Sequence, residues 1–491
     1  MSGSAEWNFA ARLLARAAGR SVLIDAPTGQ TVAPEDLLGA VAGFASGFLA
    51  AGLRSGDPVA IVCDLSSTSS LAYLGAMYAG LVPVPVPDRA WATSGEATLK
   101  KTHAKAVWTP VGVASGCVDR HEVRHLTGRL SGEGAAAPAA RREDDLAVMM
   151  PTSGSTGMPR IVMVSHGNLI ANTEAIVRSQ GLSQDERAML ILPVSYCFGA
   201  SVLHTHLYQG GGVVFDPRFM FPDKVLSAIT EFGCTTFAGV PAAYNILLRR
   251  SNLRTIPLKS LRRFLQAGGT LAPEHVQEMR RIVPHADFFV MYGQTEATAR
   301  ISCLPPARLG DKCGSVGLPL DNLQIRVVAA DGQDAEAGEP GVIWAAGKSI
   351  CLGYLDDPEA SAQKFQGGWL VTGDLGYRDQ EGFLWIVGRS DEFIKTRGVR
   401  VSLAEIEARV AAVPGVYECA AAVVPHAEAG EAFALYIVAE DGAQDVLSEI
   451  RRCLPSQWIC DSVNLVAALP RTPHGKLARA LLPRAASDRK Q

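Results

Sequence analysis

The stretch Pro151–Arg160, PTSGSTGMPR, is flanked by two apolar runs, 146–150 and 160–166, that each predict a strand. Its two glycines let the backbone turn tightly and approach a ligand, while four hydroxyls and Arg160 offer donors and positive charge. Such a loop suits phosphate oxygens, although it lacks the GxxxxGK[ST] pattern of a P-loop. On its own, a polar turn between two strands explains it equally well.

The composition around this loop is that of an ordinary globular protein. The 491 residues carry 46 Lys+Arg against 49 Asp+Glu, a formal net charge of −3. This balance gives no global attraction for nucleic acid, so we expect no nucleic-acid partner. The ten cysteines form neither a CxxC pair nor a Cys/His cluster with zinc-site spacing. They are interpreted as reduced thiols of a cytoplasmic protein.

One segment, Leu65–Pro87, is uncharged and long enough to suggest a transmembrane helix. Its glycines and the alternating Pro83, Pro85 and Pro87 predict instead a buried helix that runs into an extended strand. The N-terminal segment lacks the continuous apolar stretch of a secretory signal and is typical of a surface amphipathic helix. We therefore expect no membrane span.

The rest of the chain alternates β-rich runs with helical stretches, as a parallel sheet covered by helices requires. The sequence therefore predicts an α/β fold with a large N-terminal region of helix-covered sheets. A β-rich subdomain is expected at about 303–388, where short strands alternate with Asp-Gly turns. A small α+β C-terminal domain is expected at 389–491, after an N-terminal core at 1–388.

Four further motifs follow the loop in order along the chain. They are MYGQTE at 291–296, TGD at 372–374, GRSDEFIKTRG at 388–398 and PRTPHGK at 470–476. Together with PTSGSTGMPR they resemble the adenylate-forming superfamily, which contains acyl-CoA synthetases, adenylation domains of nonribosomal peptide synthetases and luciferases. The resemblance covers about residues 20–485 and is greatest to free-standing acyl ligases. It implies an enzyme that uses ATP with Mg²⁺.

The resemblance also implies a nucleotide site. The loop would close over the β- and γ-phosphates, with Arg160 in place of the usual lysine. Tyr292 would stack on adenine, and Asp374 has the chemistry to accept hydrogen bonds from both ribose hydroxyls. The residues assigned to the nucleotide are Thr152, Ser153, Gly154, Ser155, Thr156, Gly157, Arg160, Gly268, Gly269, Tyr292, Gly293, Gln294, Thr295, Asp374 and Arg389.

Three residues would carry the chemistry by the same resemblance. Thr295 would contact the α-phosphate, Glu296 would hold Mg²⁺, and Lys476 would bond the carboxylate and the α-phosphate as charge builds between them. The C-terminal domain would turn about a hinge near Asp391. The residues assigned to this hinge and to the path of the incoming thiol are Asp391, Lys395 and Gly398. The implied reaction forms an acyl-adenylate, which a thiol then attacks.

The substrate pocket is expected around Leu192–Gly212 and FAGVPAAY at 237–244. Peptide-synthetase domains for α-amino acids usually carry an Asp after the Phe in the first segment, whereas this chain has Gly199. A buried ammonium without a partner is costly, so we predict an acid without an α-amino group. His204 and His206 are interpreted as core or groove residues of a helix in the first segment rather than as ligands or bases. The pocket is assigned to Tyr196, Phe198, Gly199, Ala200, Val240, Pro241, Tyr244 and Gly268.

The thiol acceptor is the phosphopantetheine arm of a separate carrier protein or free CoA, and the compact length favours the carrier protein. A luciferase-like oxygenase shares the resemblance, but no feature of the sequence supports it. An inactive nucleotide-binding protein is the alternative from another class. The presence of Thr295, Glu296, Asp374, Arg389 and Lys476 argues against it.

Overall fold

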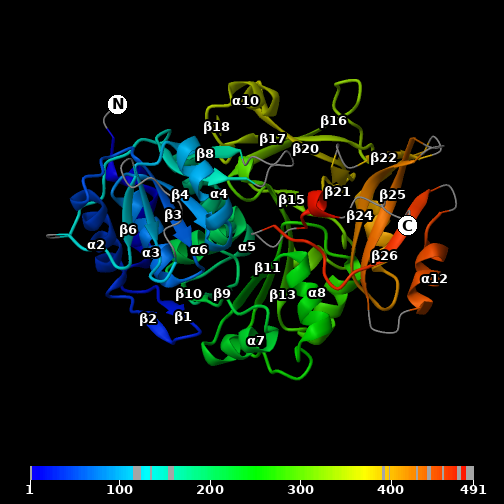
Figure 1. Ribbon diagram of the computed structural model, residues 1–491, viewed down its shortest axis with the longest axis horizontal. Coiled ribbons are helices and arrows are strands. Elements are labelled where there is room, and N and C mark those ends of the chain that lie inside the picture. The colour runs from blue at the N-terminus through cyan, green and yellow to red at the C-terminus, as the bar shows by residue number, and fades with distance from the viewer. Residues whose placement is uncertain are drawn as a thin grey trace, which may run out of the picture.

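The computed structural model describes residues 3–113, 123–132, 135–152, 160–389, 393–396, 399–426, 430–439, 444–455, 458–472 and 477–482. Figure 1 shows a large region of helix-covered sheets with the N-terminus on its left side. A β-rich layer lies above this region, and the C-terminal strands and helix lie on the right. This arrangement confirms the predicted α/β class.

A parallel four-stranded sheet in the order β4-β3-β5-β6 forms the first layer. The valines of β4 alternate with Pro83, Pro85 and Pro87. Because successive N–H groups of a strand point to opposite sides, the prolines place their missing donors on the side away from β3. The sheet and its helices are β3 (Pro58–Cys63), β4 (Val82–Pro87), β5 (Ala106–Thr109), β6 (Arg124–Thr127), α2 (Leu37–Ala50), α3 (Ser67–Tyr78) and α4 (Asp88–Thr102).

The segment that resembled a membrane span forms α3 and β4. All but one residue of α3 is buried within this layer, as the sequence predicts. Among the helices in the described ranges, none combines the length and apolarity needed to span a bilayer.

A nine-stranded sheet in the order β15-β14-β13-β12-β11-β9-β10-β1-β2 forms the second layer. Its middle strands, β13 through β1, pair in parallel, and β2, β14 and β15 pair antiparallel at the two ends. The strands are β1 (Leu23–Asp25), β2 (Gln30–Val32), β9 (Arg187–Leu190), β10 (Gly212–Phe215), β11 (Thr236–Gly239), β12 (Arg263–Gln266), β13 (Asp287–Tyr292), β14 (Ser302–Leu304) and β15 (Leu318–Pro319).

Helices cover both faces of this sheet, so its strands have apolar side chains on both faces. In β9, Ala188 and Leu190 belong to one hydrophobic cluster, and Met189, between them, belongs to the other. Helices α1 and α5–α6 contribute to the first cluster, and α7–α9 contribute to the second. These helices are α1 (Phe9–Ala17), α5 (His166–Gln180), α6 (Cys197–Gln209), α7 (Pro222–Glu231), α8 (Pro241–Arg250) and α9 (Pro273–Ile282).

The β-rich layer is a five-stranded antiparallel sheet that begins at Leu323. The predicted subdomain started near residue 303, but β14 pairs with β13 and β15 pairs with β14, so both strands extend the nine-stranded sheet instead. A separate three-stranded sheet joins β7, β8 and β18. These elements are β7 (Leu146–Pro151), β8 (Ile161–Ser165), β16 (Leu323–Val328), β17 (Gly341–Gly347), β18 (Gly353–Tyr354), α10 (Pro358–Lys364), β19 (Phe365–Gln366), β20 (Trp369–Arg378) and β21 (Leu384–Arg389).

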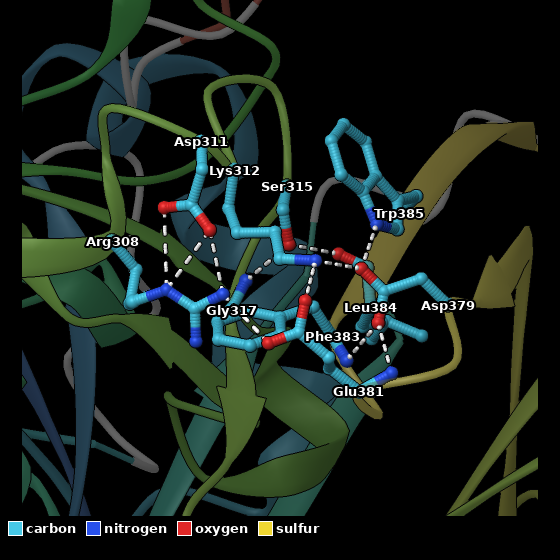
Figure 2. Close-up of polar contacts among 10 residues, drawn as sticks. All are labelled: Arg308, Asp311, Lys312, Ser315, Gly317, Asp379, Glu381, Phe383, Leu384 and Trp385. Atoms are coloured by element: carbon cyan, nitrogen blue, oxygen red, sulfur yellow. Dashed lines mark hydrogen bonds and ion pairs between the residues drawn. The ribbon is translucent and has the colours of Figure 1, made fainter.

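Ion pairs fasten the turn between β20 and β21 to the loop that follows the 3-10 helix Pro306–Arg308 (Figure 2). Lys312 Nζ lies 2.8 Å from Asp379 Oδ2 and 2.5 Å from Glu381 Oε1. The same glutamate also pairs with Arg308, at 2.8 Å. The hairpin β20–β21 carries two of the predicted nucleotide-binding residues, so this network fixes them relative to the large sheet.

The C-terminal elements have a core of their own. One hydrophobic cluster contains only residues from Ile394 onward, and a second contains only residues from Tyr417 onward. The two clusters lie on the two faces of the sheet β24-β25-β26. We propose on this basis that a separate C-terminal domain begins near residue 389. Its elements are β22 (Phe393–Thr396), β23 (Val399–Ser402), α11 (Leu403–Ala411), β24 (Val416–His426), β25 (Gly430–Ala439), α12 (Gln444–Cys453) and β26 (Cys460–Leu465).

Candidate active site

The candidate site lies at one edge of the nine-stranded sheet. Strands β9, β11, β12 and β13 run parallel, so their carboxyl ends meet at this edge, where open α/β sheets commonly bind ligands. The segments that leave these strands carry Tyr196, Val240, Gly268 and Gly293. Motifs far apart in the sequence are thereby brought together.

The hydroxyl of Tyr292, the last residue of β13, donates to Asp374 Oδ2 on β20. Arg389 on β21 is paired in register with Asp374, and its Nη1 lies 3.6 Å from Asp374 Oδ1. Burial raises the pKa of Asp374, while the Tyr292 hydrogen bond and the charges of Arg389 and Lys364 act in the opposite direction. The structure therefore assembles three of the predicted nucleotide residues around one buried carboxylate.

Lys364 is a member of this group that sequence reasoning missed. It is the last residue of α10, and its Nζ donates to the backbone oxygen of Thr372 at 2.7 Å. Burial lowers the pKa of Lys364, and the carboxylates of Glu296 and Asp374 act against that shift. A lysine in the last turn of a helix is usually a solvated residue near the negative end of the helix dipole, so the sequence carries no signal for this role.

Glu296 follows β13 in the 3-10 helix Thr295–Ala297, and its Oε1 accepts a hydrogen bond from Tyr354 at 2.7 Å. Mg²⁺ is usually held by one or two carboxylates together with the phosphates of a bound nucleotide. No group of three potential ligand side chains occurs in the described ranges. A single fixed carboxylate at the edge of a nucleotide site fits a metal ion that arrives with the nucleotide.

Arg160 packs against the same tyrosine, with its guanidinium carbon 5.3 Å from the centre of the Tyr354 ring. Its backbone oxygen accepts from both the amide and the hydroxyl of Thr152, at 2.8 and 3.2 Å, which closes the base of the loop between β7 and β8. The structure thus places Arg160, at one end of the predicted phosphate loop, and Glu296 against the same side chain, that of Tyr354.

The turn after β13 requires close packing of the backbone. A Cβ at Gly293 would lie 1.9 Å from the backbone oxygen of Ala299, so only glycine fits there. Thr298 adopts φ 65° and is held by a hydrogen bond of 2.7 Å from its hydroxyl to Ser349 O.

The hydroxyl of Thr295 lies 3.5 Å from Cys197 Sγ. The side-chain Nε2 of Gln294 is buried without a hydrogen-bond partner.

The predicted acyl pocket centres on the start of α6. Tyr196, Phe198 and Ala200 are buried, and the Tyr196 and Phe198 rings make an edge-to-face contact at 6.2 Å. Gly268 adopts φ 86°, and a Cβ there would lie 2.4 Å from the Tyr196 hydroxyl. Ala200 borders a cavity of about 20 Å³, enough for a single water molecule.

Two pocket assignments have a different structural basis. A Cβ at Gly199 would lie 2.3 Å from Pro193 O and 2.6 Å from Leu192 O, so backbone packing requires glycine there. Tyr244 is fully buried against Phe237, Phe264 and Phe288, and its hydroxyl donates to Leu265 O at 2.8 Å. Its ring therefore lies inside the core, and its assignment to the substrate pocket stays a prediction.

The neighbouring Val240 is buried, and Pro241 packs 3.3 Å from the Cβ position of Gly269. Both residues therefore lie beside the glycine segment that the sequence assigned to the nucleotide.

His204 and His206 are core residues, as the sequence predicts. His204 contacts the hydroxyl of Tyr73 at 3.2 Å and the Phe9 ring at 4.8 Å, and burial lowers the pKa of His204 to about 3. Burial likewise lowers the pKa of His206 to about 4. Both imidazoles are neutral at physiological pH and serve the packing of α6.

Some predicted residues lie outside the described residues. Nine of the ten cysteines lie within the described residues, and these nine are free thiols, in agreement with the sequence interpretation. The side chain of Lys395 lies outside the described part of the chain, although its backbone belongs to β22. The other predicted residues outside it are Ser153, Gly154, Ser155, Thr156, Gly157, Asp391, Gly398 and Lys476.

Comparison with known protein families agrees with this geometry. The model of the AMP-binding enzyme family matches residues 10–355, and the model of its C-terminal domain matches residues 405–476. The chain belongs to the AMP-binding enzyme family. The enzymes of this family use ATP with Mg²⁺, the two cofactors that the sequence predicts.

Two characterised relatives cover most of this member of the AMP-binding enzyme family. It is similar to feruloyl-CoA synthase of Amycolatopsis sp, with 32% identity over 89% of this chain and 91% of the relative. It is also similar to a 4-coumarate–CoA ligase of Humulus lupulus, with 26% identity over 94% and 90% of the two chains.

Among solved structures, the o-succinylbenzoate CoA synthetase of Bacillus subtilis, in complex with ATP and magnesium, is 27% identical. It superposes with a TM-score of 0.83 over 96% of this chain and 98% of the other.

Proposed function

We propose that this enzyme activates a carboxylic acid with ATP as an acyl-adenylate and then transfers the acyl group to the thiol of CoA. The observation that carries the proposal is the convergence of Tyr292, Asp374 and Glu296 at one sheet edge. The CoA-ligase names of the two relatives support the choice of reaction.

In this proposal the described residues bind and orient the nucleotide. Asp374 accepts hydrogen bonds from the ribose hydroxyls, and Arg389 holds the same sugar. The exposed face of Tyr292 stacks on adenine, and Thr295 contacts the α-phosphate. Glu296 holds Mg²⁺, which neutralises phosphate charge when it is bound.

The reaction then proceeds by two displacements. A carboxylate oxygen forms a bond to the α-phosphorus, and the bond to pyrophosphate breaks. In the second displacement the thiol sulfur attacks the acyl carbonyl, AMP leaves, and the proton of the thiol passes to solvent. We propose that Lys476 bonds the carboxylate and the α-phosphate in the first displacement, and that rotation of the C-terminal domain near Asp391 brings Gly398 to the thiol path in the second.

CoA is preferred over a carrier protein because both relatives bear CoA-ligase names. The carrier-protein acceptor that the sequence favoured is the competing outcome of the test. The absence of an α-amino group on the acid also stays a proposal, since the packing of Gly199 explains that glycine without reference to the substrate.

The test is pyrophosphate release by the full-length protein with ATP·Mg²⁺ and aliphatic, aryl or amino acids, followed by thioester formation with CoA. We expect release with acids that lack an amine, and a loss of at least about 100-fold in Glu296→Gln. Glu359→Gln, which changes an exposed glutamate on α10, is the matched control.

A different experimental result would contradict each part of the proposal. Silence with every acid would overturn the activity itself. Turnover of α-amino acids alone would overturn the acid class, and thioester formation only on a phosphopantetheinylated carrier protein would overturn CoA as the acceptor.

A further inference from the structure

Arg300 is a buried arginine without a carboxylate partner. Its residue is 2% exposed, and its Nε and Nη1 have no hydrogen-bond partner. No acidic side chain of the described chain forms an ion pair with it. Arg263 shows the usual arrangement, because its guanidinium pairs with the buried carboxylate of Glu186.

The surroundings of Arg300 are those of the predicted acyl pocket. Its guanidinium carbon lies 4.9 Å from the centre of the Phe198 ring. Burial lowers the pKa of the guanidinium, and the electrostatic influence of Cys303, Cys197 and Tyr196 acts in the opposite direction. The guanidinium therefore lies against the Phe198 ring at the start of α6, and among the described residues it forms no ion pair.

The backbone of Arg300 is fixed in place. Its N–H donates to Asn172 Oδ1 at 3.3 Å, and its backbone oxygen accepts from Asn172 Nδ2 at 2.9 Å. The preceding turn is held by Thr298, whose hydroxyl bonds Ser349 O. This anchoring directs the side chain toward Phe198 without using its own donors.

The fold gains little from an arginine at this position. Burying an ionised group without an acceptor is costly, and an apolar side chain of similar length would pack against Phe198 without that cost. A guanidinium cannot lose its charge as a buried lysine can. The cost is offset when a ligand supplies the missing acceptor, and the complement of a guanidinium fork is a carboxylate.

We propose that Arg300 binds a second carboxylate of the substrate, so that the acid activated by this enzyme is a dicarboxylic acid. The inference rests on the proposed function. One carboxylate reacts with ATP, and the other enters between Arg300 and the Phe198 ring, which contacts the guanidinium in the free enzyme. A monocarboxylic acid of the same length leaves the buried charge without an acceptor.

The test compares pairs of acids that differ only in the second carboxylate. The pairs are hexanoate and adipate, benzoate and terephthalate, and cinnamate and 4-carboxycinnamate. With the full-length enzyme and ATP·Mg²⁺, we expect kcat/KM for pyrophosphate release to favour the dicarboxylic member of at least one pair by about tenfold or more. In Arg300→Met this ratio should fall to about one or below, and Arg300→Lys should give an intermediate ratio because it keeps the charge without the fork.

The outcomes separate the two proposals. A wild-type enzyme that favours the monocarboxylic member of every pair, or a ratio that Arg300→Met leaves unchanged, overturns the role of Arg300 and leaves the proposed function standing. Absence of pyrophosphate release with every acid overturns both.

Thermal unfolding gives a readout independent of turnover. Arg300→Met should melt at the same temperature as the wild type or higher, because it removes an unpaired buried charge. Arg263→Met is the contrasting control and should melt lower, because it removes the closer of the two arginines that pair with the buried Glu186 and leaves Arg262, at 3.7 Å. Adipate should raise the melting temperature of the wild type and not that of Arg300→Met. A lower melting temperature for Arg300→Met without ligand would show that the guanidinium supports the fold, and would overturn the inference.

Discussion

Replacing Asp374 by Asn tests the nucleotide site directly. The amide has nearly the same shape as the carboxylate and keeps an oxygen that can accept from the Tyr292 hydroxyl. It removes the negative charge that faces Arg389 and halves the acceptor capacity of the side chain. If Asp374 holds the ribose, the variant loses at least one hydrogen bond to a charged group.

Such a bond contributes about 1.5–3 kcal/mol, so a loss of about 2 kcal/mol weakens ATP binding about 30-fold. The loss should depend on the sugar. We therefore compare the dissociation constants of ATP and 3′-deoxy-ATP, each with Mg²⁺, for the wild type and Asp374→Asn by titration calorimetry.

The four dissociation constants form a thermodynamic cycle. The 3′-deoxy analogue should bind more weakly than ATP to the wild type, and nearly as well as ATP to the variant, because the acceptor of the hydroxyl is already impaired. A coupling free energy of about 1 kcal/mol or more is expected. If the variant weakens both nucleotides by the same factor, Asp374 does not contact the ribose and the reasoning fails.

The same substitution should stabilise the free enzyme at neutral pH. Burial raises the pKa of Asp374, so folding favours its protonated form. The resulting cost to stability is absent below the ordinary carboxyl pKa of about 3.8 and is fully present above the folded-state pKa. Asp374→Asn should therefore have a higher melting temperature than the wild type at pH 7, and the difference in melting temperature should shrink as the pH is lowered. A gain in stability from such a substitution is expected at a site where function opposes stability. A variant that melts lower at pH 7 would contradict this account.

Three further substitutions probe other parts of the site. Lys364→Met removes the hydrogen bond to Thr372 O and a positive neighbour of Asp374, so KM for ATP in pyrophosphate release should rise about tenfold. The control Lys348→Met changes an exposed lysine and should leave this KM unchanged. Equal KM values for the two variants would exclude the role of Lys364. Lys476→Ala should slow adenylate formation about 100-fold or more and affect the reaction of a supplied acyl-adenylate with CoA less; equal losses would contradict its role. Gly199→Ala should destabilise the protein by about 1–3 kcal/mol in urea unfolding, because its Cβ would lie 2.3 Å from Pro193 O; an unchanged midpoint would refute the close packing.

The layered α/β fold could be predicted because its signals are local. Apolar runs of strand length alternate with helical periodicity, and Pro83, Pro85 and Pro87 mark β4 as a strand that is paired in its own sheet on one side only. Local patterns could not predict that β14 and β15 belong to the nine-stranded sheet. Their pairing with β13 and with each other depends on contacts between segments that no local pattern records.

The residues of the candidate site also fall into those that local sequence patterns identify and those that only tertiary packing identifies. Tyr292, Asp374 and Glu296 stand in short motifs, so the sequence could identify them, and the structure brings them together. Tyr244 stands in an equally suggestive run, yet the direction of its side chain depends on which face of α8 meets the sheet. Lys364 and Arg300 belong to no motif, and only their burial and their neighbours distinguish them from surface cations.

Those two cations and Asp374 show a common electrostatic feature of the site. Burial shifts the pKa of each one toward its neutral form, so each charge is less stable in the folded protein than in water. Tyr292 and Thr372 partly compensate Asp374 and Lys364 with hydrogen bonds, whereas among the described residues the guanidinium of Arg300 contacts the ring of Phe198 and forms no ion pair. In the proposed function, this arrangement is electrostatically incomplete until ligands supply ribose hydroxyls, phosphates and a carboxylate. Binding then stabilises the folded protein by mass action, and the relief of each unfavourable buried charge contributes to that stabilisation through the affinity of the ligand. The enzyme should consequently be least stable when empty and gain most from a ligand pair that meets both Asp374 and Arg300.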